Sequence, residues 1–228
     1  MVATMKKTFL EQIHNGLIVS CQAPEGSPLH GKGLMAVMAQ AAEAGGAAAI
    51  RAEGLADIRS IKAAVSIPVL GLIKLITKDT PVIITPLIEQ VGQLIDAGAD
   101  MIAVDASLRK RLDGSTGPEF VARARELGIP ILGDIDTLEA AVASEKAGAD
   151  AVSTTISGYT NGVVPKTPDI DLVGECARAC KIPVIAEGRY YTPEDVAKAF
   201  KAGAWSVCVG GAITDPLLST KRFIANMH

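Results

Sequence analysis

A repeating unit constrains the fold of this chain more than any other feature of its sequence: a short apolar run is followed by a stretch with a helical pattern. Three of the apolar runs begin with Ile-Pro, and three others follow a helical stretch that ends in Ala-Gly-Ala. The Ile-Pro runs cover residues 67–71, 129–133 and 182–186, and the Ala-Gly-Ala segments cover residues 97–99, 147–149 and 202–204. A proline can open a strand, and a glycine can end a helix in the left-handed conformation. Both the Ile-Pro and the Ala-Gly-Ala segments therefore mark boundaries between helices and strands.

Eight apolar runs are predicted to be strands, because each has the length of a strand and is hydrophobic throughout. They are Gly16–Cys21, Ala48–Arg51, Val69–Lys74, Met101–Asp105, Ile131–Asp134, Ala151–Thr155, Val184–Glu187 and Ser206–Gly210. Continuous rather than alternating hydrophobicity is typical of parallel strands that are covered on both faces. A helical pattern follows each run, over Leu34–Ala44, Leu55–Val65, Leu87–Ala97, Glu119–Leu127, Leu138–Ala147, Ile170–Ala179, Pro193–Ala202 and Thr214–Ala225.

Eight βα units in 228 residues predict an α/β protein, a (β/α)8 TIM barrel formed by one domain over residues 1–228. The 49% of apolar residues are enough for one large core. An open doubly wound sheet is the alternative. That fold usually stops at five or six strands and carries a G-x-G-x-x-G turn after the first strand, which this sequence lacks.

Several classes of protein are disfavoured by composition. No apolar run approaches the roughly 20 residues that a bilayer-spanning helix needs. Residues 1–11 contain two lysines but no apolar stretch ahead of Glu11, so we expect no signal peptide and a cytoplasmic protein. The formal net charge of −3 argues against a general nucleic-acid surface. It does not exclude an anionic ligand, because a few amides and one basic side chain can hold a phosphate.

The cysteines and histidines do not suggest a metal site. The four cysteines are Cys21, Cys176, Cys180 and Cys208, and the three histidines are His14, His30 and His228. Only Cys176 and Cys180 are close in sequence, and no histidine stands at a usual ligand spacing from them. We therefore expect buried, reduced thiols and no metal ion.

Polar residues or glycines stand at or just after the carboxyl end of every predicted strand. They are Gln22, Arg51, Lys74, Asp105, Asp134, Thr154 with Thr155, Glu187, and Gly210 with Gly211. In a barrel these ends meet at one mouth, where barrel enzymes place their chemistry. Strand ends meet water in any fold, so a single polar residue there says little. Two cations, three carboxylates and an amide in one ring predict an active site.

Lys74 and Glu187 are the strongest candidates for catalysis. Lys74 closes an apolar run, where desolvation would lower its pKa and allow it to act as a base or as a Schiff-base amine. The alternative is a lysine without a catalytic role, whose ammonium group reaches water. Glu187 also follows an apolar strand, where burial can raise the pKa of a carboxyl group toward neutral and suit it for general acid–base catalysis.

Two glycine turns follow the last two predicted strands. Gly188 and Arg189 follow the seventh strand, and Gly210 and Gly211 lie at the end of the eighth. Backbone amides from the loops after strands seven and eight are the usual phosphate cradle of barrel enzymes. We therefore expect a small phosphorylated substrate, and Arg189 could pair with its phosphate.

Three further polar residues at strand ends could have a structural role instead of a role in the active site. Arg51 and Asp134 could form an internal ion pair that holds the barrel mouth. Asp105, which precedes Ala-Ser-Leu-Arg, could cap the next segment or orient Lys74.

The sequence resembles the bacterial N-acetylmannosamine-6-phosphate 2-epimerases of sialic-acid breakdown, from Gly16 to about Phe223. The most specific matching segments are residues 17–23, 49–52, 71–74, 133–135, 154–160 and 186–189. Related phosphate-binding barrels share the glycine turns but not this set of polar strand ends.

The resemblance implies interconversion of N-acetylmannosamine 6-phosphate and N-acetylglucosamine 6-phosphate by deprotonation and reprotonation at C2, without a cofactor. It implies that Lys74 and Glu187 form the central catalytic pair. The implied substrate-binding residues are Gln22, Arg51, Asp134, Thr155 and Tyr159, and the implied phosphate-binding residues are Gly188, Arg189, Gly210 and Gly211. One departure is Asp215, because the family usually carries an arginine at that position.

Other functions stay open at this point. A class I aldolase-type lyase would use Lys74 to form a Schiff base with a keto sugar phosphate, and a regulatory barrel would only bind a phosphorylated ligand. Because Asp215 departs from the family pattern, an epimerase that acts on a different phosphorylated sugar is a further alternative. We expect a homodimer, because Leu217, Leu218 and Phe223 would form an exposed apolar face on the last helix.

Overall fold

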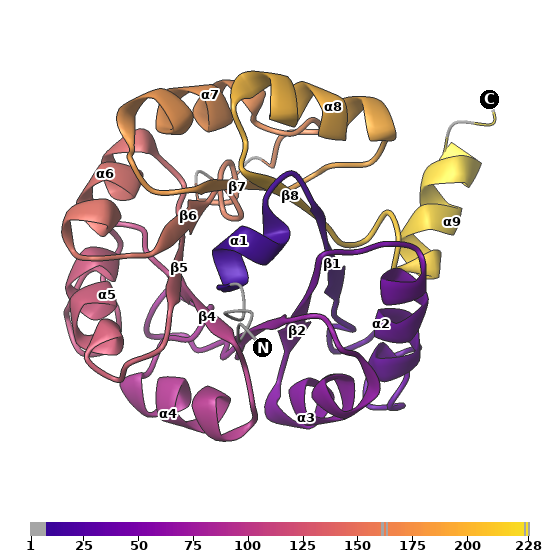
Figure 1. The fold of residues 1–228 in the computed structure, drawn as a ribbon, viewed down its shortest axis with the longest axis horizontal. Helices are drawn as coiled ribbons and strands as arrows, with labels where there is room; N and C mark the ends of the chain where they lie inside the picture. Colours follow the sequence, from indigo (N-terminus) through magenta and orange to yellow (C-terminus); the bar gives the residue numbers. More distant parts are fainter. Residues whose placement is uncertain (1–7, 161, 163, 226, 228) are drawn as a thin grey trace, which may run out of the picture.

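In the computed structural model, the parallel strands of the described residues close into a barrel in sequence order, and β8 pairs back to β1 (Figure 1). The structure describes residues 8–160, 162, 164–225 and 227; the stretch 1–7, where we expected no signal peptide, and His228 lie outside them. The strands are β1 (Leu17–Cys21), β2 (Ala49–Glu53), β3 (Val69–Leu72), β4 (Met101–Asp105), β5 (Ile131–Asp134), β6 (Ala151–Ser153), β7 (Val184–Glu187) and β8 (Ser206–Val209).

Helices surround this barrel, as the repeating unit predicts. They are α2 (Met35–Ala44), α3 (Leu55–Ala64), α4 (Ile88–Asp96), α5 (Gly117–Arg125), α6 (Leu138–Lys146), α7 (Ile170–Ala179), α8 (Pro193–Ala202) and α9 (Pro216–Ala225). The (β/α)8 barrel is therefore confirmed. Within the described part of the chain, no helix combines the length and the hydropathy needed to cross a bilayer.

The predicted boundary signals act as expected. Pro68, Pro130 and Pro183 each stand directly before a strand. Gly98, Gly148 and Gly203 follow helices with φ angles of 91°, 96° and 106°. β3 and β6 each end two residues earlier than predicted, at Leu72 and Ser153, so Lys74 and Thr155 lie just beyond the sheet.

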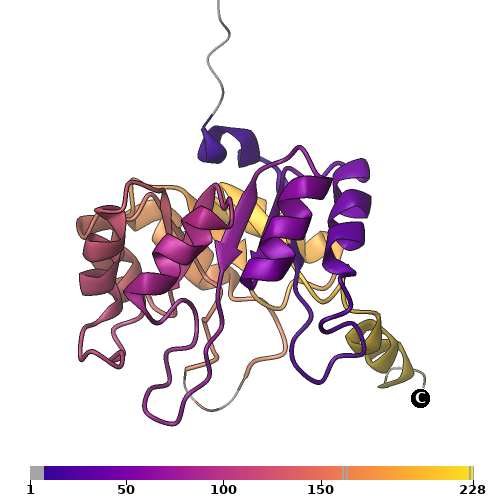
Figure 2. The same cartoon turned by 90° about the horizontal axis from the view of Figure 1, so that it is seen from below.

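A short helix that the sequence did not predict, α1 (Phe9–Ile13), covers the end of the barrel opposite the long loops (Figure 2). Thr8 and Glu11 form a capping box at its start. The indole Nε1 of Trp205 donates to the carbonyl of Leu10 at 2.9 Å, and the rings of His14 and Trp205 lie 3.9 Å apart. These contacts seal the amino-terminal end of the barrel and leave the carboxyl end open.

The apolar core has two layers, which explains the continuous hydrophobicity of the strands. Alternate strand residues such as Ile18, Leu70 and Leu132 fill the barrel interior. Their neighbours, such as Val19 and Val69, pack between the sheet and the helices. Both faces of each strand are therefore buried, as expected for a parallel sheet.

Two glycines allow a test of the packing between β4 and α5. A Cβ on Gly117 would overlap backbone atoms of Ala106 and Ser107, whereas a Cβ on Gly92, inside α4, would meet nothing within 4 Å. We expect Gly117→Ala to lower the free energy of unfolding by about 3 kcal/mol, because backbone must move. Gly92→Ala should raise it by up to about 1 kcal/mol through helix propensity. Urea unfolding followed by circular dichroism measures both, and similar values would contradict this account.

Candidate active site

A cavity of about 440 Å³ opens at the carboxyl end of the barrel. Ten of the residues selected from the sequence line it, in agreement with their position at strand ends: Gln22, Lys74, Thr155, Tyr159, Glu187, Gly188, Arg189, Gly210, Gly211 and Asp215. The barrel thus brings together residues from the ends of five strands, β1, β3, β6, β7 and β8, around one space. Lys74 and Glu187 share this space rather than standing on separate surfaces.

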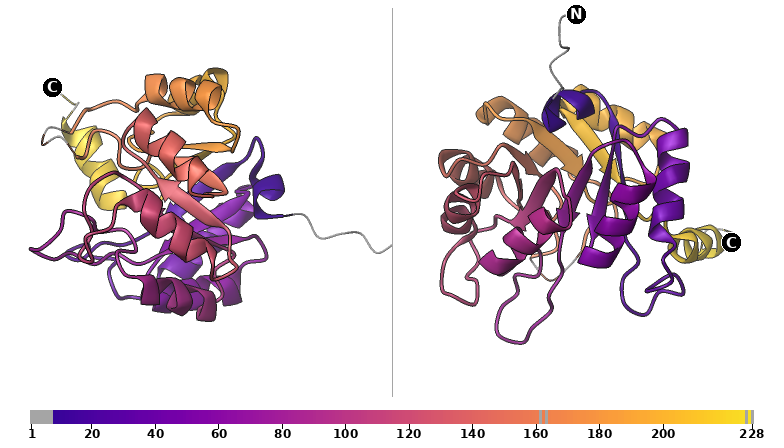
Figure 3. Two further views of the ribbon diagram at one scale, coloured as in Figure 1. Left: turned by 90° about the vertical axis from the view of Figure 1, so that its left-hand side faces the viewer. Right: turned by 60° about the horizontal axis from the view of Figure 1, so that its bottom comes forward.

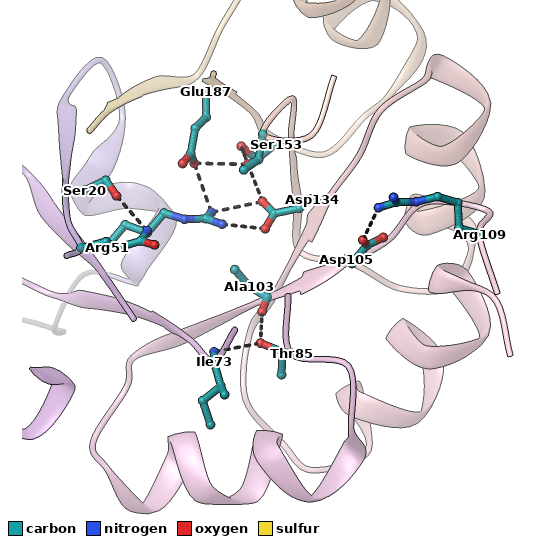
Figure 4. A network of polar contacts seen from close by, with 12 residues as sticks. Ser20, Arg51, Ile73, Thr85, Ala103, Asp105, Arg109, Asp134, Ser153 and Glu187 are labelled. Carbon is teal, nitrogen blue, oxygen red and sulfur yellow. Dashed lines mark hydrogen bonds and ion pairs between the residues drawn. The ribbon is translucent and has the colours of Figure 1, made fainter. Parts of the chain in front are cut away.

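Arg51 and Asp134 lie beneath the cavity and form a buried ion pair (Figure 4). The two guanidinium nitrogens Nη1 and Nη2 of Arg51 donate to Oδ1 and Oδ2 of Asp134 at 3.1 and 2.6 Å. Nη1 also lies 3.1 Å from Oε2 of Glu187. The side chains of Arg51 and Asp134 are 1% and 0% exposed, against 14% for Glu187. Of the two alternatives for this pair, the structure shows the internal ion pair.

Thr155 contacts both carboxylates that surround Arg51. Its Oγ1 lies 2.5 Å from Asp134 Oδ1 and 3.2 Å from Glu187 Oε2. It also lies 2.8 Å from the hydroxyl of Ser153. A hydroxyl has one proton to donate. Thr155 therefore donates to one carboxylate at a time, and it holds both close to Arg51.

The environment of Glu187 favours its protonated form. Burial raises the pKa of this carboxyl, the positive charge of Arg51 lowers it, and the negative charge of Asp134 raises it again; the net result is a raised pKa. A carboxyl group with a raised pKa can exchange a proton near neutral pH. Glu187 is thus suited to general acid–base chemistry at the cavity wall.

Lys74 lies two residues beyond β3, on a segment that returns along itself. Residues 74 and 84 form an antiparallel bridge, and the N–H of Leu75 donates to the carbonyl of Ile83 at 3.0 Å. The side chain points into the open cavity and is accessible to solvent. Desolvation by the cavity rim and the charge of Arg51 lower the pKa of Lys74, although Glu53, Glu187 and Asp134 oppose the shift. A lowered pKa increases the fraction of neutral amine, which is the form that can accept a proton.

The glycine turns after β7 and β8 line the same cavity. Gly188 has φ 107°, a conformation that side chains rarely adopt. After β8, the N–H groups of Ile213 and Thr214 both donate to the carbonyl of Gly210. In the described residues, the N–H groups of Gly211 and Ala212 have no acceptor in this turn. Free amides at the start of a turn of helix suit an anion.

Arg189 lines the cavity but has other partners as well. Its Nε donates to the carbonyl of Thr167 at 2.7 Å, and its Nη1 donates to the carbonyl of Ser157 at 2.5 Å. The residue is 7% exposed. Arg189 therefore fixes the loop between β6 and α7, and only part of its guanidinium is available to a ligand.

Asp105 does not line the cavity. Its Oδ2 accepts a hydrogen bond from Nη2 of Arg109 at 2.6 Å, and its Oδ1 accepts one from the N–H of Ser107 at 3.0 Å. Figure 4 shows this pair apart from the Arg51 cluster. Of the two roles considered for Asp105, the structure shows the local one, in which it caps the segment that follows β4.

Several cavity residues were missed in the sequence, including Ser20, Ile83, Ile84, Tyr190, Tyr191, Cys208, Thr214 and Leu218. Cys208 could have been found, because it faces inward on β8 opposite Glu187 in the register. Burial and the neighbouring Glu187 raise the pKa of its thiol well above the ordinary value. The segment with Ile83 carries no periodic pattern that would place it at the mouth.

No cluster of three side chains that could bind a metal ion is found in the described part of the chain.

Comparison with known sequences finds a matching family and close relatives of this chain. A family model described as "Putative N-acetylmannosamine-6-phosphate epimerase" matches residues 35–228. A curated protein of Caldanaerobacter subterraneus subsp. tengcongensis is 48% identical over 223 residues, which cover 96% of this chain and 94% of that protein. One from Clostridium perfringens (strain SM101) is 45% identical over 215 residues, covering 94% of this chain and 97% of that protein. Both are named "Putative N-acetylmannosamine-6-phosphate 2-epimerase".

Solved structures agree with these sequence matches. A chain from the structural and biochemical characterization of the N-acetylmannosamine-6-phosphate 2-epimerase from Clostridium perfringens superposes with a TM-score of 0.93 at 42% identity, and 99% of each chain is covered. Thiamine phosphate pyrophosphorylase from Pyrococcus furiosus shares only the fold, with a TM-score of 0.61 at 16% identity. On the extent of the family match and on these identities, the chain belongs to the N-acetylmannosamine-6-phosphate epimerase family.

Proposed function

We propose that this protein interconverts N-acetylmannosamine 6-phosphate and N-acetylglucosamine 6-phosphate. The observation that carries the proposal is one cavity that holds an amine with a lowered pKa, Lys74, and a carboxyl with a raised pKa, Glu187. The glycine turns after β7 and β8 supply a phosphate site in the same cavity. The family membership supports this pair of sugars as substrates.

The chemistry requires an acid–base pair of this kind. Inverting C2 requires removal of a proton next to a carbonyl group, so the sugar ring must first open to the aldehyde. Neutral Lys74 accepts the C2 proton and becomes an ammonium, and the electron pair moves onto the carbonyl oxygen to form an enediolate-like intermediate. The protonated carboxyl of Glu187 then donates a proton to the opposite face of C2, and the ring closes. The Lys74 ammonium loses its proton to water and the Glu187 carboxylate takes one from water, which restores both groups. Glu187 assists ring opening and closing by moving a proton to and from the ring oxygen and the aldehyde.

The other cavity residues hold the sugar and the catalytic groups. Gln22 donates to the hydroxyl of Ser20 at 2.9 Å, while its buried Oε1 has no partner among the described residues. We assign this oxygen to a hydroxyl or acetamido N–H group of the substrate, because a buried acceptor without a partner is costly. Tyr159 lies at the rim. Arg51, Asp134 and Thr155 hold Glu187 in place.

The test is an NMR assay of the purified protein with N-acetylmannosamine 6-phosphate in deuterated water. We expect N-acetylglucosamine 6-phosphate to form with deuterium at C2, and we expect N-acetylmannosamine without the phosphate to react far more slowly. Absence of product would refute the proposal. Trapping with borohydride distinguishes the aldolase-type alternative, because epimerisation predicts no covalent adduct on Lys74.

We also propose a homodimer that works in the cytoplasm. In the described chain no residue of α9 is buried, and Phe223 and Ile224 are 77% and 59% exposed. Figure 3 shows α9 at the outer edge of the molecule, whereas α2 to α8 each have buried residues. A second copy of the chain would cover this apolar face. The four cysteines are unpaired, which suits a reducing compartment.

Light scattering tests the dimer. We expect the unchanged protein to have twice the mass of the 228-residue chain, and Phe223→Ser combined with Ile224→Ser to shift it toward the monomer. The control is Ile76→Ser, because Ile76 is 81% exposed on the loop after β3 and lies outside α9. A monomeric unchanged protein, or a double variant that stays dimeric, would contradict the proposal.

A further inference from the structure

Asp215 places a carboxylate at the glycine end of the cavity. It lines the same space as Gly188, Gly210 and Gly211, and its Cβ lies 3.7 Å from the position that a Cβ on Gly211 would take. One oxygen, Oδ1, accepts the N–H of Leu218 at 2.9 Å and so caps the start of α9. In the described residues the carboxylate has no ion-pair partner. Oδ2 is therefore left to interact with a ligand in the cavity.

The charges around Asp215 do not neutralise it. The other titratable residues that line the cavity are Lys74, Tyr159, Glu187, Arg189, Tyr190, Tyr191 and Cys208. Lys74 and Glu187 form the proposed catalytic pair. Arg189 already donates to the carbonyls of Ser157 and Thr167. On α9 itself, Arg222 stacks on the ring of Tyr191 with its guanidinium carbon 4.0 Å from the ring centre.

We propose that Asp215 is a specificity-determining residue that makes the cavity select the monoanion of the substrate's phosphate group. This inference rests on the proposed function, because it takes the phosphate to lie on the glycine turns. A phosphate dianion has only acceptor oxygens, and it would meet a carboxylate of the same charge there. The monoanion carries one P–O–H group, which can donate to Oδ2 of Asp215 while its other oxygens accept backbone N–H groups.

The proposal predicts how affinity depends on pH. The second pKa of a phosphate monoester is about 6, so the monoanion fraction falls about tenfold for each pH unit well above that value. We expect the Kd for N-acetylglucosamine 6-phosphate to rise between pH 6.5 and 8.5 in the unchanged protein. In Asp215→Asn the rise should be largely lost, and binding at pH 8 should be at least about tenfold tighter because the like charge is gone.

Asparagine is the informative substitution because it keeps the helix cap. Asparagine and aspartate are equally good capping residues, so α9 should remain in place. Asp171→Asn makes the same change of charge in the first turn of α7, outside the cavity, and should leave the pH dependence unchanged. Glu187 lines the same cavity and has a raised pKa, but its contribution is common to the three proteins and cancels in the comparison.

Isothermal titration calorimetry from pH 5.5 to 8.5 measures the Kd, and the ³¹P chemical shift of the bound phosphate reports its protonation. A monoanion signal at pH 7.5 in the unchanged protein and a dianion signal in Asp215→Asn are the expected results. The same Kd and shift in both proteins would show that Asp215 only caps α9. If the sugar phosphate does not bind at all, the proposed function fails; inorganic phosphate titrated in the same way then decides whether Asp215 selects the monoanion.

Discussion

Lys74→Met should reduce kcat by about 10³- to 10⁴-fold, the usual contribution of a well-placed general base, and should change KM only a few-fold. Methionine keeps the length and apolar stem of the side chain but has no group that can accept a proton. The remaining cavity, including the glycine turns, is left intact. The substrate should therefore still bind while its C2 proton is no longer removed.

Exchange of the C2 proton gives the sharper readout. In deuterated water, uptake of deuterium at C2 should fall in parallel with epimerisation in Lys74→Met. The matched control is Lys78→Met, because Lys78 is an exposed lysine on the same loop and does not line the cavity. It should retain full activity. Deuterium uptake in Lys74→Met at the rate of the unchanged protein would remove Lys74 from the proposed mechanism.

Arg51→Met should lower the free energy of unfolding by about 3–5 kcal/mol, the cost of breaking a buried ion pair. Burial alone would lower the pKa of Arg51, but Asp134 and Glu187 raise it well above the ordinary value, so the guanidinium stays charged. Without it, two carboxylates that share the hydroxyl of Thr155 would be left together in the barrel. Thermal or urea unfolding at pH 7.5 measures the loss.

A second ion pair with the same contact distance serves as the control for Arg51. Arg109 and Asp105 also lie 2.6 Å apart, but the arginine side chain is 25% exposed, against 1% for Arg51. Arg109→Met should cost about 1 kcal/mol, because the Arg109 side chain is partly in water and the N–H and hydroxyl of Ser107 still donate to Asp105. Equal losses in the two variants would show that burial is not what makes the Arg51 pair important.

The barrel could be predicted from the sequence because its strands and helices repeat with clear boundary signals. Helix α1 could not, since five residues are too few for a periodic pattern and only Thr8 and Glu11 mark its start. The end of β3 was also misplaced: its pairing with β4 stops at Gly71, and Lys74 pairs instead with the returning segment at Ile84.

The site could be predicted as a set of strand ends but not as a set of contacts. Asp105 and Asp134 both end a strand and are partners in the register of β4 and β5. One nevertheless binds Arg109 and the other binds Arg51. Which way a side chain points at the end of a strand depends on the arrangement of the strands around the barrel, and spacing along one chain does not contain that information.

The position of Trp205 has a practical consequence. It is the one tryptophan of the sequence, and it lies against α1 and His14 at the closed end of the barrel. Its fluorescence should therefore follow the detachment of α1 and be nearly silent when a sugar phosphate enters at the other end. The indole thus signals events at the base of the barrel while the chemistry proceeds at the top.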